Sequence, residues 1–199
     1  MLVREKGKFL LIFKKALVII SLLMLFLSLP VIRAEAARDF TDMMGRDVKV
    51  PDQVNRVVTT YKSATQFVLA LNAEDKLVGV SMKTDKQPLF INIEPRLAEL
   101  PQVGSKRNGI NLETTAEVNP DLVILYPHRD AVETAEKLEQ QGIAALIINP
   151  ESLAQIRETT KLLGKVLKKE KEAEAVRSEE GRVGKESVSE CRFRWSPYH

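Results

Sequence analysis

The chain has 199 residues, of which 44% are hydrophobic and 29% charged, and its formal net charge is +3. Positions 1–36 hold six basic and two acidic residues, whereas positions 37–176 hold 19 and 21, a net charge of −2. The basic excess therefore lies outside the central part of the chain, and no nucleic-acid partner is indicated. The single cysteine, Cys191, lies near the carboxyl end, so the central part has no disulfide and must be stabilised by its core.

The first 36 residues are predicted to be a secretory signal peptide. An apolar run over positions 16–29 is preceded by four lysines, Lys6, Lys8, Lys14 and Lys15. Ala34-Glu35-Ala36 is a small-x-small cleavage site, and the apolar run is shorter than the ~20 residues that a membrane-spanning helix needs. Cleavage is therefore favoured over an uncleaved anchor. No cysteine lies near the cut, so no lipoprotein anchor is expected, and the mature protein is predicted to be periplasmic or associated with the cell surface.

After this leader, apolar runs typical of strands alternate with amphipathic stretches typical of helices. Residues 39–51 predict a small hairpin with Gly45 near its turn. Strands are predicted at 56–60, 76–81, 101–105, 122–125 and 144–148. Helices are predicted at 64–71, at 90–100 with a break at Pro95, at 111–118, at 130–141 and from 152 onward. This order of βαβ units predicts an α/β fold, a doubly wound lobe with a four- or five-stranded parallel sheet.

The stretch from 111 to 126 is the most informative part of this pattern. Asn111 is a candidate helix N-cap with Glu113 in the first turn, and the residues predicted to face inward are Leu112, Ala116 and Val118. Pro120 ends the helix, because proline disfavours helical geometry in the residue before it. The apolar run 122–125 is typical of a strand buried on both faces. Polar residues follow at its carboxyl end, where open α/β sheets place their ligands: Tyr126, His128 and Arg129.

Two later helices are predicted from capping-box spacing, in which a polar residue is followed three positions later by Glu or Gln. The pairs are Asp130 with Glu133 and Ser152 with Gln155. Gly142 is expected to end the first of these helices, because glycine accepts left-handed geometry. The second helix is expected to bury Leu153, Ile156, Leu163 and Leu167. The charged run 168–174 is expected to continue or restart it.

The order of these pieces resembles the substrate-binding proteins of bacterial and archaeal ABC importers for iron–siderophore complexes, cobalamin and haem. The resemblance covers residues 39–176. No single matching stretch is specific, but six of them in this order at reasonable spacing are. The stretches are Thr41–Arg46 with Val50-Pro51, Arg56–Val58, Asp75–Ser81, Leu100–Ser105, Asn111–Glu113 with Asn119–Ile124, and Leu138–Gly142 leading into the 152–164 helix. In that family two α/β lobes are joined by a long helix, and the ligand lies between them. The resemblance implies that residues 37–176 form the amino-terminal lobe with the start of the connecting helix, and nothing in the chain resembles the second lobe.

The same resemblance implies a non-enzymatic protein without a cofactor of its own, expected to be a monomer. It would capture a metal chelate, such as a ferric siderophore, a corrinoid or haem, and deliver it to the permease subunits of an ABC importer. Substrate-binding residues are then expected in the loops after the strands: Tyr61, Lys83, Arg107, Tyr126, His128 and Arg129. The cations suit anionic groups of a chelate, with solvated surface charge as the other interpretation. Glu113 matches the acidic residue that docks on the permease in this family, with stabilisation of the helix end as its alternative.

Three other interpretations remain at this stage. A zinc- or manganese-binding relative is a poorer match, because His128 is the only histidine before the last 23 residues. A secreted α/β enzyme is opposed by the absence of G-x-G-x-x-G, P-loop and G-x-S-x-G motifs, so no catalytic residue and no metal ligand is predicted. Residues 177–199 resemble a translated sequencing adapter, which we expect to be an artefactual fusion at about Val176. The chain would then be a truncated fragment, with no function as written.

Overall fold

The computed structural model describes residues 36–105 and 109–178. Residues 1–35 of the predicted signal peptide, nearly all of the predicted adapter-like tail and Arg107 lie outside these ranges. Within the described part of the chain, none of the helices is long and apolar enough to cross a membrane.

Six strands form one mostly parallel sheet in the order β6-β5-β4-β3-β7-β8. Their bounds are β3 (Val57–Thr59), β4 (Leu77–Ser81), β5 (Gln102–Ser105), β6 (Gly109–Ile110), β7 (Leu122–Leu125) and β8 (Ala144–Ile147). Neighbouring strands are parallel except β5 and β6, which pair antiparallel at one edge. From β3 the chain builds outward through β4 and β5, then crosses to β7 and β8 on the other side. The predicted doubly wound sheet is confirmed, and β6 is an additional strand that the sequence pattern did not indicate.

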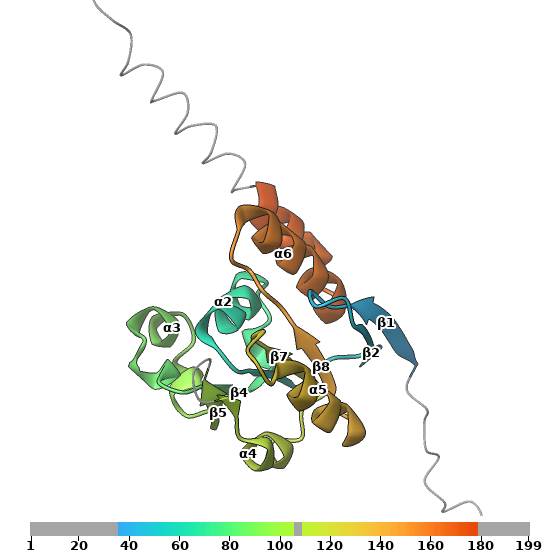
Figure 1. Ribbon diagram of the computed structural model, residues 1–199. Helices are drawn as coiled ribbons and strands as arrows, with labels where there is room; N and C mark the ends of the chain where they lie inside the picture. The colour runs from blue at the N-terminus through green and yellow to red at the C-terminus, as the bar shows by residue number, and fades with distance from the viewer. Residues whose placement is uncertain (1–35, 106–108, 179–199) are drawn as a thin grey trace, which may run out of the picture. The chain divides into compact units, whose positions relative to one another are not determined.

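Helices cover both faces of this sheet (Figure 1). One side carries α2 (Lys62–Ala70), α3 (Pro88–Ile93) and α6 (Leu153–Leu167), and the other carries α4 (Leu112–Glu117) and α5 (Ala131–Gln140). Single-turn 3-10 helices complete the connections: η1 (Glu74–Lys76), η2 (Thr84–Lys86) and η3 (Pro95–Ala98). The predicted break at Pro95 is confirmed, since α3 ends at Ile93 and η3 begins at the proline.

The central strands divide their side chains between two cores. In β7, Leu122 and Ile124 belong to the core under α2 and α6, whereas Val123 and Leu125 belong to the core under α5. All four are buried, because successive side chains of a strand point to opposite faces and both faces are covered. This pattern explains why the strand reads as a continuous apolar run rather than as an alternation.

A polar clamp aligns the starts of β3 and β7. The Asp121 carboxylate accepts hydrogen bonds from the backbone N–H groups of Asn55 (2.7 Å) and Arg56 (2.9 Å). The Arg56 guanidinium in turn donates to the carbonyls of Val118 (2.7 Å) and Asn119 (2.9 Å) at the end of α4. The two side chains thereby provide hydrogen-bond partners for backbone N–H and C=O groups that lie outside the strand pairing. The clamp thus links the residues just before β3 to the start of β7, where the two strands pair from Val57 and Leu122 onward.

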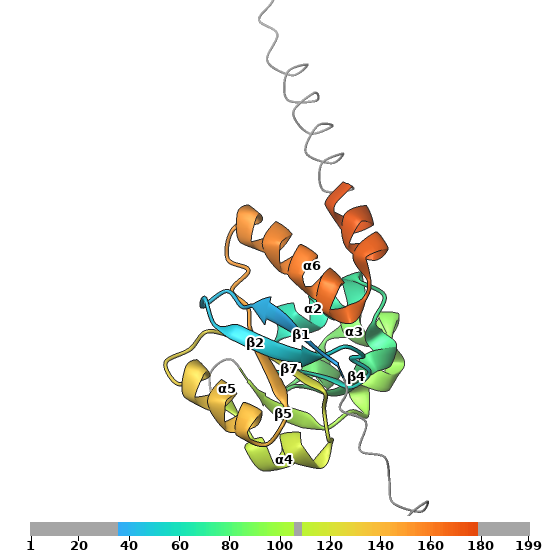
Figure 2. The ribbon, with the colours of Figure 1, turned by 90° about the vertical axis from the view of Figure 1, so that its right-hand side faces the viewer.

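The predicted hairpin is present as β1 (Ala37–Thr41) and β2 (Asp47–Pro51), with Gly45 at a φ of 78° in the turn. It lies beside β8 and the carboxyl half of α6 (Figure 2). The Arg38 guanidinium donates to the carbonyls of Lys165 and Val166, both at 2.8 Å. Both carbonyls belong to the last helical turn, where that of Lys165 also accepts from the Lys168 N–H (3.4 Å), so the hairpin contributes to the cap of α6.

The charged run after α6 restarts a helix rather than continuing one. Lys168 adopts left-handed geometry with a φ of 58°, and a second helix covers residues 170–178. The two helices meet closely, because a Cβ added at Gly164 would lie 2.6 Å from the Cβ of Ala173. Glycine at this position allows the corner to close.

Some local predictions are wrong. Ala116 is exposed and Thr115 is buried instead, because the short α4 turns the 112-115-118 face inward and the Thr115 hydroxyl donates to the Asn111 carbonyl (2.7 Å). Leu153 is 66% exposed, since the buried face of α6 begins only at Thr159. Asp130 makes no capping bond, as its φ of −104° and ψ of 16° lie outside the extended geometry of an N-cap.

Candidate functional site

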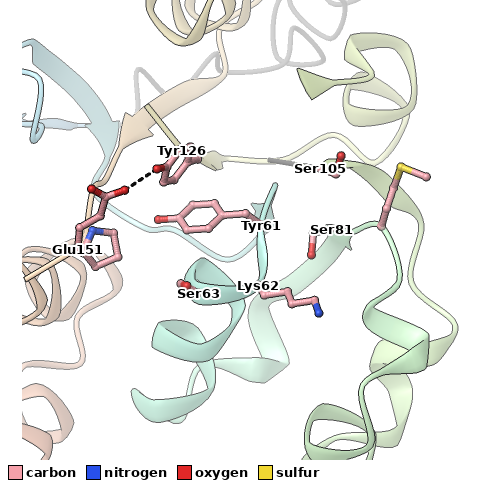
Figure 3. Close-up of a pocket in the computed structure, with 9 residues that line it drawn as sticks. Tyr61, Lys62, Ser63, Ser81, Ser105, Tyr126 and Glu151 are labelled. Atoms are coloured by element: carbon pink, nitrogen blue, oxygen red, sulfur yellow. Dashed lines mark hydrogen bonds between the residues drawn. The ribbon is translucent and has the colours of Figure 1, made fainter. Parts of the chain in front are cut away.

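A pocket of about 530 Å³ opens at the edge of the sheet where the parallel strands end. Each strand of this group contributes the residues at or just after its carboxyl end (Figure 3). The lining residues are Tyr61, Lys62 and Ser63 after β3, Ser81 and Met82 at the end of β4, Ser105 at the end of β5, Tyr126 after β7, and Pro150 and Glu151 after β8. Its volume lies in the range of small-molecule sites.

Two tyrosines stand at the point where the order of the sheet reverses. Tyr61 follows β3 and Tyr126 follows β7, and these two strands are neighbours whose crossovers lead to opposite sides. Their rings meet edge to face, with centroids 5.3 Å apart and planes at 69°. Open α/β sheets bind ligands at such a switch point, because the diverging connections leave a crevice there.

The hydroxyl of Tyr61 is already used by the fold. It donates to the carbonyl of Ile148 at 3.1 Å, which ties the end of β3 to the end of β8. The side chain is buried, and this burial, with a smaller effect of Tyr126, raises the pKa of the phenol. Tyr61 is therefore a neutral hydrogen-bond donor, and its ring lines the pocket in a position that this bond holds.

Tyr126 is held from the opposite wall. Its hydroxyl donates to Oε1 of Glu151 at 2.6 Å (Figure 3). Glu151 precedes the N-cap of α6, and its backbone N–H donates to Oε1 of Gln155 (3.2 Å) while Ser152 Oγ accepts from the Gln155 N–H (3.2 Å). The predicted cap at Ser152 is confirmed, although the Gln155 side chain returns to Glu151 rather than to Ser152.

The remaining wall is formed by hydroxyl groups and one cation. Lys62 and Ser63 open α2, whose amino end has no side-chain cap and no acidic residue in its first turn. The Ser81 and Thr84 hydroxyls lie 3.2 Å apart, and the Thr84 hydroxyl donates to the Ser81 carbonyl. The Ser81 hydroxyl is consequently the donor to Thr84. A helix amino end attracts negative charge, so this wall suits a ligand's acceptor groups.

Two of the sequence-predicted site residues, Tyr61 and Tyr126, line the pocket together. Lys83 follows the lining residue Met82 but is itself exposed, with its backbone N–H donating to Oε1 of Gln102 (3.0 Å). His128 turns back toward α5, where its Nδ1 accepts from the Asp130 N–H (3.2 Å), and the adjacent Arg129 is exposed. None of these three is among the lining residues. The predicted binding roles, including that of Arg107, stay predictions.

Glu113 lies in the first turn of α4 and is exposed. Asn111 caps the same helix, as predicted, by accepting from the Thr114 N–H at 3.1 Å. The Glu113 carboxylate is thus accessible to a partner and also well placed to stabilise the helix end.

Sequence reasoning missed Glu151 and several hydroxyl residues of the pocket, chiefly Ser63, Ser81 and Ser105. The signal that finds them is the rule already applied to Tyr61 and Tyr126: the residues just past each buried strand belong to one edge. Glu151 was missed because its segment was interpreted only as the approach to a helix.

A second, larger groove of about 710 Å³ lies between the β1–β2 hairpin and α6. Its lining includes Asp39, Phe40, Glu158 and Lys161, and no residue of it follows a strand of the main sheet. It therefore lacks the convergence of strand ends that marks the first pocket. Within residues 36–105 and 109–178, no group of three or more His, Cys, Asp or Glu side chains is placed to hold a metal ion.

The family described as periplasmic binding protein matches residues 57–179. A vitamin B12-binding protein of Vibrio vulnificus is 32% identical over 103 residues, which is 52% of this chain and 35% of that protein. The molybdate-binding protein MolA of Haemophilus influenzae is 30% identical over 94 residues, 46% of this chain and 26% of that protein. The chain thus spans about a third or less of these relatives.

Solved structures share this fold. A periplasmic solute-binding protein of Veillonella parvula superposes with a TM-score of 0.66 at 29% identity, over 80% of this chain and 47% of that one. Staphylococcus aureus SirA, solved with staphyloferrin B, gives a TM-score of 0.62 at 26% identity, over 80% and 53%. Sequence and structure comparisons thus agree, and the family match covers more than half of the chain. This protein belongs to the periplasmic binding protein family.

Proposed function

We propose that this chain supplies one wall of the ligand site in the solute-binding component of an ABC importer, and that the ligand is a metal chelate. The observation that carries the proposal is the pocket at the switch point of the sheet, with the Tyr61–Tyr126 pair at its base. Relatives that bind vitamin B12, and a solved relative that holds the siderophore staphyloferrin B, support this ligand class. Members of this family are binding proteins, which favours a non-enzymatic role.

The geometry favours a chelate with a flat or apolar face. Tyr126 presents a ring that is fixed from one side by Tyr61 and from the other by Glu151. A held aromatic ring loses little conformational entropy when it packs on a ligand, and such contacts contribute about 1 kcal/mol beyond area burial. Around the rings, Ser63, Ser81 and Ser105 place hydroxyl oxygens that suit amide or hydroxyl groups on a ligand.

To test this, the full chain is titrated separately with cyanocobalamin, hemin, ferric staphyloferrin B and molybdate, and binding is measured by calorimetry. Saturable binding of one of the three chelates is expected, weakened about tenfold by Tyr126→Ala, since one lost aromatic contact costs about 1.4 kcal/mol. Lys161→Ala, in the second groove, is the matched control and should leave the affinity unchanged. If only molybdate binds, the ligand is an oxyanion and not a metal chelate. If none of the four compounds binds, the proposal is contradicted.

For the mature protein we further propose export, and docking on permease subunits through Glu113. The exposed carboxylate on α4 supports the docking role. Reversing its charge by Glu113→Arg should abolish uptake in cells while leaving ligand affinity intact. A variant that transports normally would leave only the helix-stabilising role.

A further inference from the structure

The pocket carries one charged residue at each of two walls. Lys62 belongs to α2, and Glu151 precedes α6. Figure 3 shows the Lys62 side chain extending away from Tyr126 and Glu151. Neither charge forms an ion pair with the residues that the structure describes. The two opposite charges are therefore separated and both remain available to a ligand.

Glu151 is also fixed in place. Its carboxylate accepts the Tyr126 hydroxyl at 2.6 Å, and its backbone N–H donates to the Asn149 carbonyl (3.1 Å) and to Oε1 of Gln155 (3.2 Å). The negative charge is thereby kept beside the ring that a ligand would contact. An anionic group approaching Tyr126 meets this charge at short range. Such a repulsion in a water-exposed site corresponds to about fivefold weaker binding per anionic group.

The opposite wall has the reverse preference. Lys62 contributes an ammonium group, and the first turn of α2 contains no acidic side chain to offset the positive end of the helix. Anionic groups of a ligand are favoured on this side by both features. The pocket thus distinguishes not only how much charge a ligand carries but also where it carries it.

We propose that Glu151 is a specificity-determining residue that, together with Lys62, orients the ligand by charge. The inference rests on the proposed function, since it concerns the same pocket. It specifies the ligand class further: a chelate with its anionic groups gathered at one edge, on the Lys62 side, and a neutral hydrogen-bonding face against Tyr126 and Glu151. Chelates that are anionic around their whole perimeter are selected against.

The charge effect is measurable without any ligand. The chain has three tyrosines and one tryptophan, so in a Trp195→Phe, Tyr198→Phe background only Tyr61 and Tyr126 fluoresce. Quenching by iodide, an anion, is compared with quenching by neutral acrylamide. Glu151→Gln, which keeps the acceptor for Tyr126, should raise the iodide-to-acrylamide ratio about twofold, and Lys62→Gln should lower it. Glu158→Gln, which removes a carboxylate of α6 that lies in the second groove, is the control. A ratio in Glu151→Gln equal to that of the control overturns the inference.

Ligand binding then separates this inference from the proposed function. Ferric citrate, anionic on all sides, should bind about fivefold more tightly to Glu151→Gln than to the original chain, whereas neutral cyanocobalamin should change less than twofold. Equal changes for both probes overturn charge selection and leave chelate capture standing. If neither probe binds any variant while the iodide ratio still shifts, charge selection stands and chelate capture fails.

Discussion

Replacing Tyr61 by Phe tests whether the fold, rather than a ligand, uses its hydroxyl. The substitution keeps the edge-to-face contact with Tyr126 and removes only the donor to the Ile148 carbonyl. That carbonyl lies in a buried residue and would be left unpaired, which costs about 1 to 2 kcal/mol. Tyr126→Phe is the matched control, because its lost bond to Glu151 is exposed to water and contributes about 0.5 kcal/mol or less.

Urea unfolding of the full chain, followed by circular dichroism, measures the difference. With a slope of about 1.5 kcal/mol/M, a loss of about 1.5 kcal/mol lowers the urea midpoint by about 1 M. The midpoint of Tyr126→Phe should fall by no more than about a third of that. The reasoning is refuted if Tyr61→Phe is as stable as the original chain, or if Tyr126→Phe loses more. The first result would mean that the Tyr61 hydroxyl does not stabilise the fold, and the second that the Tyr126 hydroxyl stabilises it more.

Three further predictions concern contacts outside the pocket. Gly164→Ala should lower the free energy of unfolding in urea by about 1 to 3 kcal/mol, because the new Cβ would lie 2.6 Å from that of Ala173. Adding Ala173→Gly to this variant should restore stability, whereas a more stable Gly164→Ala would show that helix propensity outweighs the steric clash. Asp121→Ala should cost about 1 kcal/mol by the same assay, since two water-exposed backbone N–H groups lose a charged acceptor, and an unchanged stability would show that water replaces it fully. Hydrogen bonding by Lys168, with smaller attractions from Lys168 and Arg38, holds the pKa of Asp52 below its ordinary value of 3.8. The charged form is then favoured in the folded state, so the pair stabilises the protein above pH 3.8 and this contribution is lost as the pH falls through the folded pKa. In Lys168→Gln, an NMR titration should show the Asp52 pKa rising toward 3.8, and an unchanged pKa would exclude the pairing.

The sequence was sufficient for the central strands of the sheet, because they are buried on both faces, but not for the half-buried edge strand β6. A short apolar run such as 122–125, bounded by turn residues, favours a central strand covered by helices on both sides. The order of strands and helices then determined the doubly wound arrangement, and the rule for strand ends located Tyr61 and Tyr126. These inferences depend on the periodicity of apolar residues and on the order of strands and helices, both of which can be read from a single sequence.

The predictions that were wrong or missing depend on contacts between particular side chains and the backbone, which neither the periodicity of apolar residues nor the order of elements reveals. The pattern around Asp130 matches a capping box, yet the backbone there follows the turn that His128 makes toward α5. Ala116 was expected to face inward on apolar character alone, whereas Thr115 is buried there because its hydroxyl is satisfied by the Asn111 carbonyl. Glu151 lies after β8 and could have been found by the strand-end rule, but its bond to Tyr126, 25 positions away, could not be predicted from the pattern.

The central claim is that ligands bind where the strands of the main sheet end. The most direct measurement is amide chemical-shift mapping by NMR on the full chain, titrated with the chelate that binds most tightly. The account predicts that the largest shifts cluster at Tyr61, Met82, Ser105, Tyr126 and Glu151, with none in the groove between the hairpin and α6. Shifts confined to that groove, or no saturable shifts with any of the chelates, would contradict it.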